Sequence, residues 1–570
     1  MSRYAAGMLL LLFGGILLGG LSKPWEFSSA MVFIFAVASL RPEAAEVPGM
    51  AWWLLWLGWM ALSVAHSAEP LLGLWPLAKW GGAVALWGLL RAEQSRWRPF
   101  WFLGLLACAL IVGPAARVAH SGFLPPNENY TAFVLAAVAA AGLGVWGNPK
   151  ADAKLGRAAI AVALLALIGI LRIKSRGALL GVLAALLAGF FRPWSRRRAL
   201  AVVVTLAVAL AALPMNWWEY LWSAVFKFGW SAGMARPRIW AAALNVAADH
   251  PFLGEGPGNF TAGFLRHLPS SGRRFVHFGF YADQAHSQII QFAADAGLTG
   301  LGLFLAATWR AADWRREKNL EEEAAFRAVI AMSAHAFVDN MLHLPGAALL
   351  FFSALACLPS RVGKKPTGVS GWRLFCAAGA IVAMAAFGAR ALEKSCAATP
   401  MEGPRGVAAA RRCLRWFPSD AERHERLARA YWGLRPPQPG LALAEIKRAG
   451  ALAPFDALYP AMEAELLAHR RDWPAMLVCA DRAVFLEPHF IEARLLRARA
   501  LKELGDGKAA RKEWEGAGRL SQRLARSLAP GDVKSGYDRV VLSFDPARYR
   551  RLGRVLTSPH EQPYPYGVDY

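Results

Sequence analysis

The residues best suited to bind an anion are five cations that lie near the ends of apolar segments. They are Arg172, Lys174, Arg176, Arg236 and Arg238. A guanidinium keeps its charge and forms forked hydrogen bonds to phosphate oxygens. Charges placed tight against a membrane are costly unless they have an anionic partner. We therefore interpret these cations as a site for a phosphate-bearing ligand, with contact to lipid phosphates as the alternative.

One histidine adds the possibility of proton transfer to such a site. His286 stands at the predicted start of a helix, whose free N–H groups and dipole favour an anion beside it. An imidazole can take up a proton near neutral pH. A bound diphosphate leaving group fits both properties, so His286 is the candidate catalytic residue. The alternative is an ordinary polar residue at the surface.

Further polar residues and glycines are candidates for supporting roles. They are Asn129, Gln291, His335, Asp339, Gly254 and Gly256. His335 and Asp339 are expected to share a helix face in a predicted span, where they either face a cavity or form a buried pair that orients a neighbour. Asn129 could bind sugar hydroxyls or cap a helix. The two glycines suit a tight loop whose backbone approaches a ligand closely.

A metal site is the competing interpretation of the loop that precedes His286. It would use the acidic and histidine side chains of that loop, which are His250, Glu255, His277, Asp283 and His286. No H-E-x-x-H, D-x-D or cysteine pair accompanies them in the sequence. A Ser-His-Asp hydrolase would need a G-x-S-x-G sequence, which is also absent. We therefore expect chemistry without a metal or another cofactor.

The composition places these residues in a membrane protein. Of the 570 residues, 56% are hydrophobic and 18% are charged, whereas soluble proteins carry about 25% charged residues. The mean hydropathy is +0.30, and the 24 tryptophans suit a chain with many bilayer interfaces. These values exclude a simple cytosolic enzyme, and the apolar content excludes a disordered chain.

Apolar runs predict an all-α, polytopic membrane protein with about 12–13 transmembrane helices, because a spanning helix needs about 20 mostly apolar residues. Thirteen candidates occur at 5–22, 28–40, 50–66, 71–90, 99–118, 130–147, 157–172, 177–192, 199–214, 287–309, 324–341, 344–359 and 372–390. We assign them to a membrane domain at 1–392, with a long loop at 215–286. The loop opens with a tryptophan-rich stretch at 217–230, which indicates either a helix in the membrane interface or packing against other spans.

Lysine and arginine mark alternate loops, and this predicts the orientation of the chain. The marked loops contain Arg91, Arg96 and Arg98; Lys150, Lys154 and Arg157; Arg192, Arg196, Arg197 and Arg198; Arg310, Arg315, Arg316 and Lys318; and Arg361, Lys364 and Lys365. By the positive-inside rule these loops and the N-terminus are cytoplasmic. The loop at 215–286 and everything after 390 then face outward. The net charge of +24 therefore requires no nucleic acid.

The composition changes after about residue 395, where charge rises and the aliphatic spacing becomes helical. Pro454 and Pro488 are 34 residues apart, which is the tetratricopeptide period. We predict an α-solenoid of about three such repeats at 395–525, followed by an irregular tail at 526–570. Stacked repeats offer a concave face to a protein partner, and a scaffold without a specific ligand is the alternative. Three cysteines follow the last span, and the sequence does not decide whether any two pair.

The region from about 125 to 355 resembles the O-antigen ligase and O-antigen polymerase superfamily of bacterial membrane glycosyltransferases. The pieces that carry the resemblance are Ser175-Arg176-Gly177-Ala178; Arg236 with Trp240; His250-Pro251 with Gly254 and Gly256; His286 with Gln291, Asp295, Gly297 and Gly300; and His335 with Asp339. The resemblance implies a fold like that of the C-type glycosyltransferases. Ser287 replaces an Asn that often follows the family's histidine, so an acceptor contact through that amide would be lost. Asp295 stands where Glu is commoner.

The resemblance implies transfer of a glycan from undecaprenyl diphosphate to an acceptor hydroxyl at the periplasmic face of the bacterial inner membrane. Arg176 and Arg236 would hold the diphosphate, helped by Arg238 and Lys174, and His286 would activate the acceptor without a metal. The acceptor would be a lipid A core sugar, another glycan repeat, or a protein Ser or Thr. Two other classes remain open: a flippase or transporter for a lipid-linked glycan, and a non-catalytic membrane anchor for the repeats.

Overall fold

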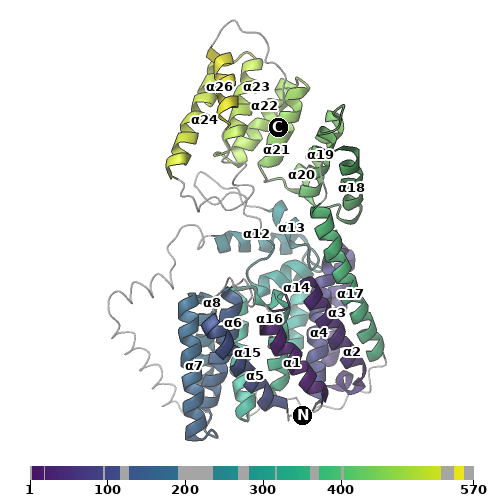
Figure 1. Ribbon diagram of the computed structural model, residues 1–570, viewed down its shortest axis with the longest axis vertical. Helices are drawn as coiled ribbons and strands as arrows, with labels where there is room; N and C mark the ends of the chain where they lie inside the picture. The colour runs from purple at the N-terminus through teal and green to yellow at the C-terminus, as the bar shows by residue number, and fades with distance from the viewer. Residues whose placement is uncertain are drawn as a thin grey trace, which may run out of the picture. The chain divides into compact units, whose positions relative to one another are not determined.

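The computed structural model describes residues 3–17, 20–93, 97–115, 128–190, 235–267, 282–314, 318–359, 371–398, 403–527 and 545–557. Within these residues the protein is all-α, with 22 helices (Figure 1). The chain divides into two compact units. The first is Met1–Phe260 with Gln284–Glu393, and the second is Thr261–Asp283 with Lys394–Tyr570.

The apolar helices belong to the first unit. They are α1 (Arg3–Leu17), α2 (Pro24–Ser39), α3 (Met50–His66), α4 (Pro70–Ala92), α5 (Arg98–Ala115), α6 (Glu128–Gly147), α7 (Ala153–Ile173), α8 (Arg176–Phe190), α14 (Gln288–Arg310), α15 (Leu320–Val338), α16 (Pro345–Cys357) and α17 (Trp372–Ala397), which continues into the second unit. Two short 3-10 helices, η1 (Pro42–Glu46) and η3 (Met341–His343), and the more polar α12 (Ala235–Asp249) complete this unit. Each predicted span coincides with a helix except 199–214, which lies outside the described residues together with the tryptophan-rich stretch at 217–230.

Four of these helices are long and apolar enough to cross a membrane by their length and composition. They are α6, α7, α14 and α17. Several others, including α1, α2, α3, α8 and α16, are apolar but shorter. The chain is therefore a multi-pass membrane protein, while the larger number of spans and their orientation stay predictions.

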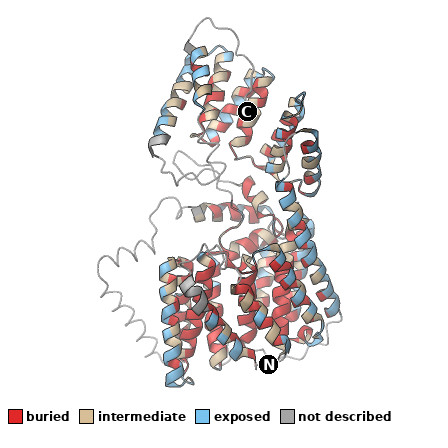
Figure 2. Cartoon of the chain, viewed as in Figure 1, coloured by how far each residue is buried: buried red, intermediate tan, exposed pale blue. Residues whose placement is uncertain are grey.

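Burial separates a central helix from outer ones (Figure 2). α6 packs against α7, α8 and α15, and 94% of its apolar window is buried. The corresponding fractions are 28% for α7 and 22% for α17, and α7 exposes leucines such as Leu164 and Leu165. Apolar residues all around a helix are typical of a membrane span. The exposed leucines of α7 therefore suit contact with lipid chains.

An aromatic cluster fixes α14 against α3 and α4. Trp53 and Trp56 of α3 contact Phe304 of α14 at centroid distances of 5.8 and 5.1 Å. Trp80 of α4 contacts Phe292 of α14 at 5.3 Å. Aromatic side chains bury large areas and prefer such edge or tilted contacts. The cluster therefore places the first turns of α14, which carry several site residues, on a rigid support.

The second unit is a series of helices, and those from Gly403 onward each pack against the next described helix along the chain. They are α13 (Phe260–Arg266), most of which lies here, α18 (Gly403–Trp416), α19 (Ala421–Trp432), α20 (Pro439–Leu452), α21 (Leu458–His469), α22 (Trp473–Leu486), α23 (Ile491–Glu503), α24 (Gly507–Ser527) and α26 (Pro546–Thr557). Small buried residues such as Ala428, Ala464 and Ala498 let the helices approach closely. The tail predicted to be irregular contains one helix, α26, among its described residues, and the repeats stay a prediction.

A disulfide joins the end of α17 to α18. Cys396 and Cys413 are bonded, with their Cα atoms 5.6 Å apart, and Cys108, Cys357, Cys376 and Cys479 are free. Disulfides persist in oxidising compartments and are rare in the cytosol. The bond is compatible with the predicted outward position of this part of the chain, which stays a prediction.

We expect the unfolded, unreduced protein to expose four reactive thiols, because two of its six cysteines are paired. After reduction all six should react with a maleimide, counted by mass shift. Cys396→Ser should leave Cys413 reactive without any reductant. Labelling of all six cysteines in protein taken directly from the membrane would contradict both the pairing and the outward orientation.

Candidate functional site

Two of the predicted site residues meet a carboxylate at the end of α15. The Oδ2 atom of Asp339 accepts a hydrogen bond from Nη2 of Arg236 at 3.2 Å. Its Oδ1 atom lies 3.5 Å from Nδ1 of His286. The Asp339 side chain is only 5% exposed. A buried carboxylate thus lies between a guanidinium and an imidazole, which come from segments about 50 residues apart.

This arrangement differs from the shared helix face expected for His335 and Asp339. The helix ends at Val338, and Asp339 has extended backbone angles, φ −148° and ψ 150°. Its carboxylate therefore turns toward Arg236 and His286. His335 is fully buried and its ring lies 5.5 Å from that of Phe133. Neither ring nitrogen of His335 has a hydrogen-bond partner within the described part of the chain.

The backbone at the start of α14 positions His286. Its φ of 50° lies in the left-handed region, which residues with side chains rarely adopt. The N–H of the preceding Ala285 donates to Oε1 of Gln291 at 2.7 Å, and this bond holds the turn. The His286 side chain is 39% exposed. It can therefore meet a ligand while it touches a buried acid.

Arg236 lies in the first turn of α12 and is bound to the same end of α15. Besides its bond to Asp339, its Nη1 donates to the carbonyl oxygen of Val338 at 3.0 Å. Arg238 is on the same turn and is half-buried, and it has no ion pair or side-chain hydrogen bond among the described residues. One arginine is thus held by the protein, whereas the other has no acidic partner in this part of the chain.

Arg176 begins α8, and the residue after it packs directly on α15. A Cβ atom on Gly177 would lie 2.4 Å from Cδ2 of His335 and 3.3 Å from Cγ2 of Val338. Glycine therefore allows the start of α8 to approach this part of α15. Arg176 is half-buried and makes no ion pair or hydrogen bond with any described residue. Lys174 ends α7 with a left-handed backbone, φ 58°.

Asn129 belongs to the same end of the helices. It is the second residue of α6, and Phe133 on the next turn contacts the ring of His335. The other end of α6 meets the start of α15, since a Cβ atom on Gly144 would lie 2.8 Å from Cα of Ala324. The two helices are therefore antiparallel, and the start of α6 lies at the end of α15.

Three other buried polar atoms belong to the segments that meet here. They are Nε1 of Trp240, Oε1 of Gln288 and Oδ1 of Asn340, and none has a hydrogen-bond partner within the described residues. Gln288 follows His286 by two residues, and Asn340 directly follows Asp339. Buried polar groups are normally hydrogen-bonded. These atoms are therefore suited to contact a polar ligand or water.

The predicted glycine loop lies against a break in α14. Gly297 has φ 69° and ψ 178° inside that helix. The N–H groups of Glu255 and Gly256 donate to the carbonyl oxygens of Ala294 and Asp295 at 2.8 and 2.9 Å. A Cβ atom on Gly254 would lie 2.4 Å from the backbone of Asp295. Gly254 and Gly256 thus bring their backbone against α14, where they satisfy the carbonyls freed by the break.

Gly297→Ala is expected to destabilise the membrane unit by about 2–4 kcal/mol, because the new Cβ would lie 2.1 Å from the carbonyl oxygen of Phe252 and the backbone angles are accessible almost only to glycine. The thermal unfolding temperature in detergent should fall. Gly302→Ala in the same helix is the matched control, since a Cβ there meets nothing within 4 Å. Equal unfolding temperatures for the two variants would contradict the tight contact.

Residues 161–305 match the protein family described as O-Antigen ligase. This segment is an O-antigen ligase domain within a helical membrane protein. The family suggests that the chain is a membrane enzyme of the glycosyltransferase type. A comparison with curated proteins finds no match.

The O-antigen ligase domain contains most of the predicted site residues, but not all. Arg176, Arg236 and His286 lie within the matched segment, whereas Asn129, His335 and Asp339 lie outside it. The acid that contacts His286 is therefore supplied by a helix beyond the segment. The structure brings it there because α14 and α15 contact each other.

Three residues that contact the segments of Asp339 and His286 could not be identified from the motifs, namely Lys79, Gln284 and Asn340. Asn340 donates from its side chain to Gln284 and Gln291, at 3.4 Å in each case. Lys79 of α4 is buried and donates to the carbonyl oxygen of Leu342 at 2.9 Å. A lysine inside the apolar run 71–90 was a detectable signal, because an ionisable residue in a span usually has a function. The amides carried no comparable signal.

Two of the side chains that the metal interpretation would use are paired with each other in the structure. His250 and Glu255 lie 3.5 Å apart, between Nε2 and Oε2. Within the described residues of the chain, no group of three or more His, Cys, Asp and Glu side chains is arranged to hold a metal ion. His277 lies outside the described residues. The two acid–base side chains of the glycine loop are thus paired with each other.

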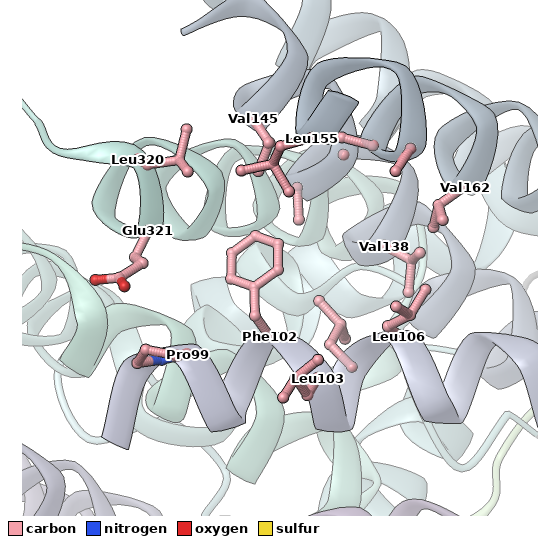
Figure 3. A pocket seen from close by; sticks show the side chains of 15 residues that line it. Pro99, Phe102, Leu103, Leu106, Val138, Val145, Leu155, Val162, Leu320 and Glu321 are labelled. Carbon is pink, nitrogen blue, oxygen red and sulfur yellow. The ribbon is translucent and has the colours of Figure 1, made fainter. Parts of the chain in front are cut away.

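An apolar pocket of about 360 Å³ opens among α5, α6, α7 and α15 (Figure 3). Its lining includes Phe102, Val138, Val145, Leu155 and Glu321. Val145 and Glu321 belong to the end of α6 and the start of α15, which is the opposite end of these helices from Asn129 and Asp339. This pocket therefore has neither the cations nor the histidine of the candidate site.

Proposed function

We propose that this protein transfers a glycan from an undecaprenyl-diphosphate donor to an acceptor hydroxyl at the periplasmic face of the inner membrane. The observation that carries the proposal is the meeting of His286 and Arg236 on the Asp339 carboxylate. It joins a group that can take a proton to one that can bind a phosphate. The O-antigen ligase match over 161–305 supports the same reaction class.

In the proposed reaction, arginines neutralise the diphosphate. Arg176 and Arg238 have no acidic partner among the described residues, and Arg236 keeps one side of its guanidinium on Asp339. Arginine binds phosphate oxygens through paired N–H groups. Such charges act most strongly where negative charge grows on the leaving group. Lys174, at the turn before Arg176, is proposed to share this role.

His286 is proposed as the general base, and Asp339 as its orienting partner. With a proton on Nδ1 facing Asp339, Nε2 is free to accept the proton of the acceptor hydroxyl; this tautomer is assigned from the contact. The acceptor oxygen then forms a bond to the anomeric carbon of the donor. The bond from that carbon to the diphosphate oxygen breaks, and the diphosphate lipid leaves with the electron pair. The 3.5 Å separation of His286 and Asp339 is long, as such contacts often are before a substrate binds.

The unpartnered polar atoms near His286 suit a carbohydrate. Trp240, Gln288 and Asn340 offer one N–H donor and two carbonyl acceptors. Sugar hydroxyls both donate and accept hydrogen bonds, so they can satisfy both kinds of group. Asn129 is proposed to take part from α6, and Gly254 and Gly256 to support the site indirectly by holding α14.

We extend the proposal to the arrangement of the whole chain. The membrane domain at 1–392 would have a cytoplasmic N-terminus, with the ligase-like core at 125–355 and the loop at 215–286 outside. The helices at 395–525 would be periplasmic tetratricopeptide-like repeats, ahead of a tail at 526–570. Their consecutive packing and the Cys396–Cys413 disulfide support this view. The repeats would bring a protein partner to the acceptor, which is a core lipid, a glycan or a protein.

The proposal is tested with purified protein in nanodiscs, given an undecaprenyl-diphosphate glycan and each class of acceptor. We expect release of the diphosphate lipid together with a new glycosidic bond, detected by mass spectrometry, in the presence of a chelator. A parallel assay in sealed vesicles follows the glycan lipid across the bilayer. Movement of the glycan lipid across the bilayer without bond formation would favour a flippase and overturn the proposal. If neither bond formation nor movement occurs, the proposal is also overturned, and a non-catalytic membrane anchor is favoured.

A further inference from the structure

A buried lysine that the proposed reaction does not use lies behind the site. Lys79 is in the middle of α4 and only 5% exposed. Its Nζ donates to the carbonyl oxygens of Leu342 and His343 at 2.9 and 3.3 Å. Both carbonyls belong to the end of η3, which begins two residues after Asp339. Lys79 thus holds the segment that carries the Asp339 carboxylate.

A second set of polar contacts starts at Asp295 in α14. The Oδ1 atom of Asp295 accepts a hydrogen bond from Nε2 of Gln291 at 2.8 Å. Gln291 in turn accepts the N–H of Ala285, the residue before His286, at 2.7 Å. A line of polar contacts therefore runs from Asp295 through Gln291 to the backbone that presents His286.

Asn340 closes the network between the two segments. Its side-chain amide donates to Oε1 of Gln291 at 3.4 Å, and its backbone N–H donates to Oδ1 of Asp339 at 2.9 Å. The segment carrying His286 and the segment carrying Asp339 are thus both connected to Lys79. A charge inside a membrane protein is costly unless it is paired and hydrogen-bonded. The two hydrogen bonds of Lys79 therefore tend to hold the segment after Asp339 in place, and with it the contact between Asn340 and Gln291.

We propose that Lys79 is a positioning residue that keeps His286 and Asp339 in contact during glycan transfer. This inference rests on the proposed function. Lys79 contacts neither side chain directly, so its effect passes through η3 and through Gln291. Loss of the Lys79 ammonium releases the two carbonyls of η3, and Gln291 then shifts with Asn340, together with the turn before His286. A misplacement of about 1 Å in a reacting group can lower a rate by on the order of 100-fold.

The test compares Lys79→Met, Asp295→Asn and the double variant in the nanodisc assay, with kcat expressed per folded molecule. We expect Lys79→Met to lower kcat by roughly 10- to 100-fold and to leave the donor KM nearly unchanged. The double variant should lose no more than Lys79→Met alone, because both substitutions act on the His286 turn through the contacts of Gln291. Lys154→Met, at an exposed position of α7, is the matched control and should keep full activity.

Three results would overturn the inference. Lys79→Met could keep full kcat per folded molecule, or it could change only KM. The third is a double variant whose loss of kcat equals the product of the losses of the two single variants. A purely structural role would reduce the folded fraction and leave kcat per folded molecule intact. His286→Ala is assayed in parallel to separate the two claims. If His286→Ala is inactive and Lys79→Met is fully active, only the role of Lys79 fails, whereas an active His286→Ala overturns the proposed function itself.

Discussion

His286→Ala is expected to lower kcat for glycan transfer by roughly 10²- to 10⁴-fold, which is the usual contribution of a general base. The variant removes the group that takes the acceptor proton and leaves the arginines in place. The donor KM should therefore change little. The His286 side chain is 39% exposed, so its loss should not unfold the protein. The measurement is the rate of glycosidic bond formation at saturating donor and acceptor.

A double variant separates the role of His286 from that of Asp339. If the two side chains act as a unit, Asp339→Asn added to His286→Ala should reduce the rate no further. His66→Ala provides the matched control, because His66 is an exposed histidine at the end of α3. Full transfer by His286→Ala at equal amounts of folded protein would exclude the general-base role.

Arg176→Ala and Arg236→Ala are each expected to reduce kcat/KM by roughly 10²- to 10³-fold, as loss of one group that stabilises developing negative charge typically does. The two variants should differ in stability. Arg176 makes no ion pair or hydrogen bond with the described residues, so its removal should leave the unfolding temperature unchanged. Arg236 is bonded to Asp339 and Val338, so its removal leaves a buried carboxylate with one cation fewer and should lower the unfolding temperature.

Lysine substitutions refine this prediction. Arg176→Lys keeps the charge but loses the forked geometry, so it should recover only part of the activity. Arg157→Ala is the control, because Arg157 is exposed in the first turns of α7, at the other end of that helix from Lys174. Diphosphate release at the normal rate by Arg176→Ala would show that the leaving group is bound elsewhere.

Much of the helical framework is predictable from local sequence. The span predicted at 50–66 has the same bounds as α3, and the span predicted at 372–390 begins at the same residue as α17. Consecutive apolar residues indicate a membrane span, and this signal requires no knowledge of the neighbouring helices. The candidate cations and His286 could be proposed from the sequence, because charge and proton-transfer chemistry are properties of single side chains. The family resemblance added the order in which these residues occur.

The partner of Asp339 could not be predicted in this way. Spacing of four residues predicted a shared helix face for His335 and Asp339, but the helix ends at Val338 and the carboxylate turns to Arg236 and His286. The end of a helix depends on what its last carbonyls and the following chain contact. Here the chain after α15 is held by Lys79 from α4, more than 250 residues earlier in the sequence.

The sequence by itself determined the class of protein, the apolar segments and the residue types that suit a diphosphate-linked reaction. These follow from transfer of side chains into lipid and from intrinsic acid–base properties, which are local. The tertiary structure decided which charges meet, because a buried carboxylate is stable only where cations from distant segments reach it. It also decided that Gly254 and Gly256 lie against the broken helix α14. A glycine in the sequence permits a close backbone approach, but only the packing of the helices determines which segment approaches it.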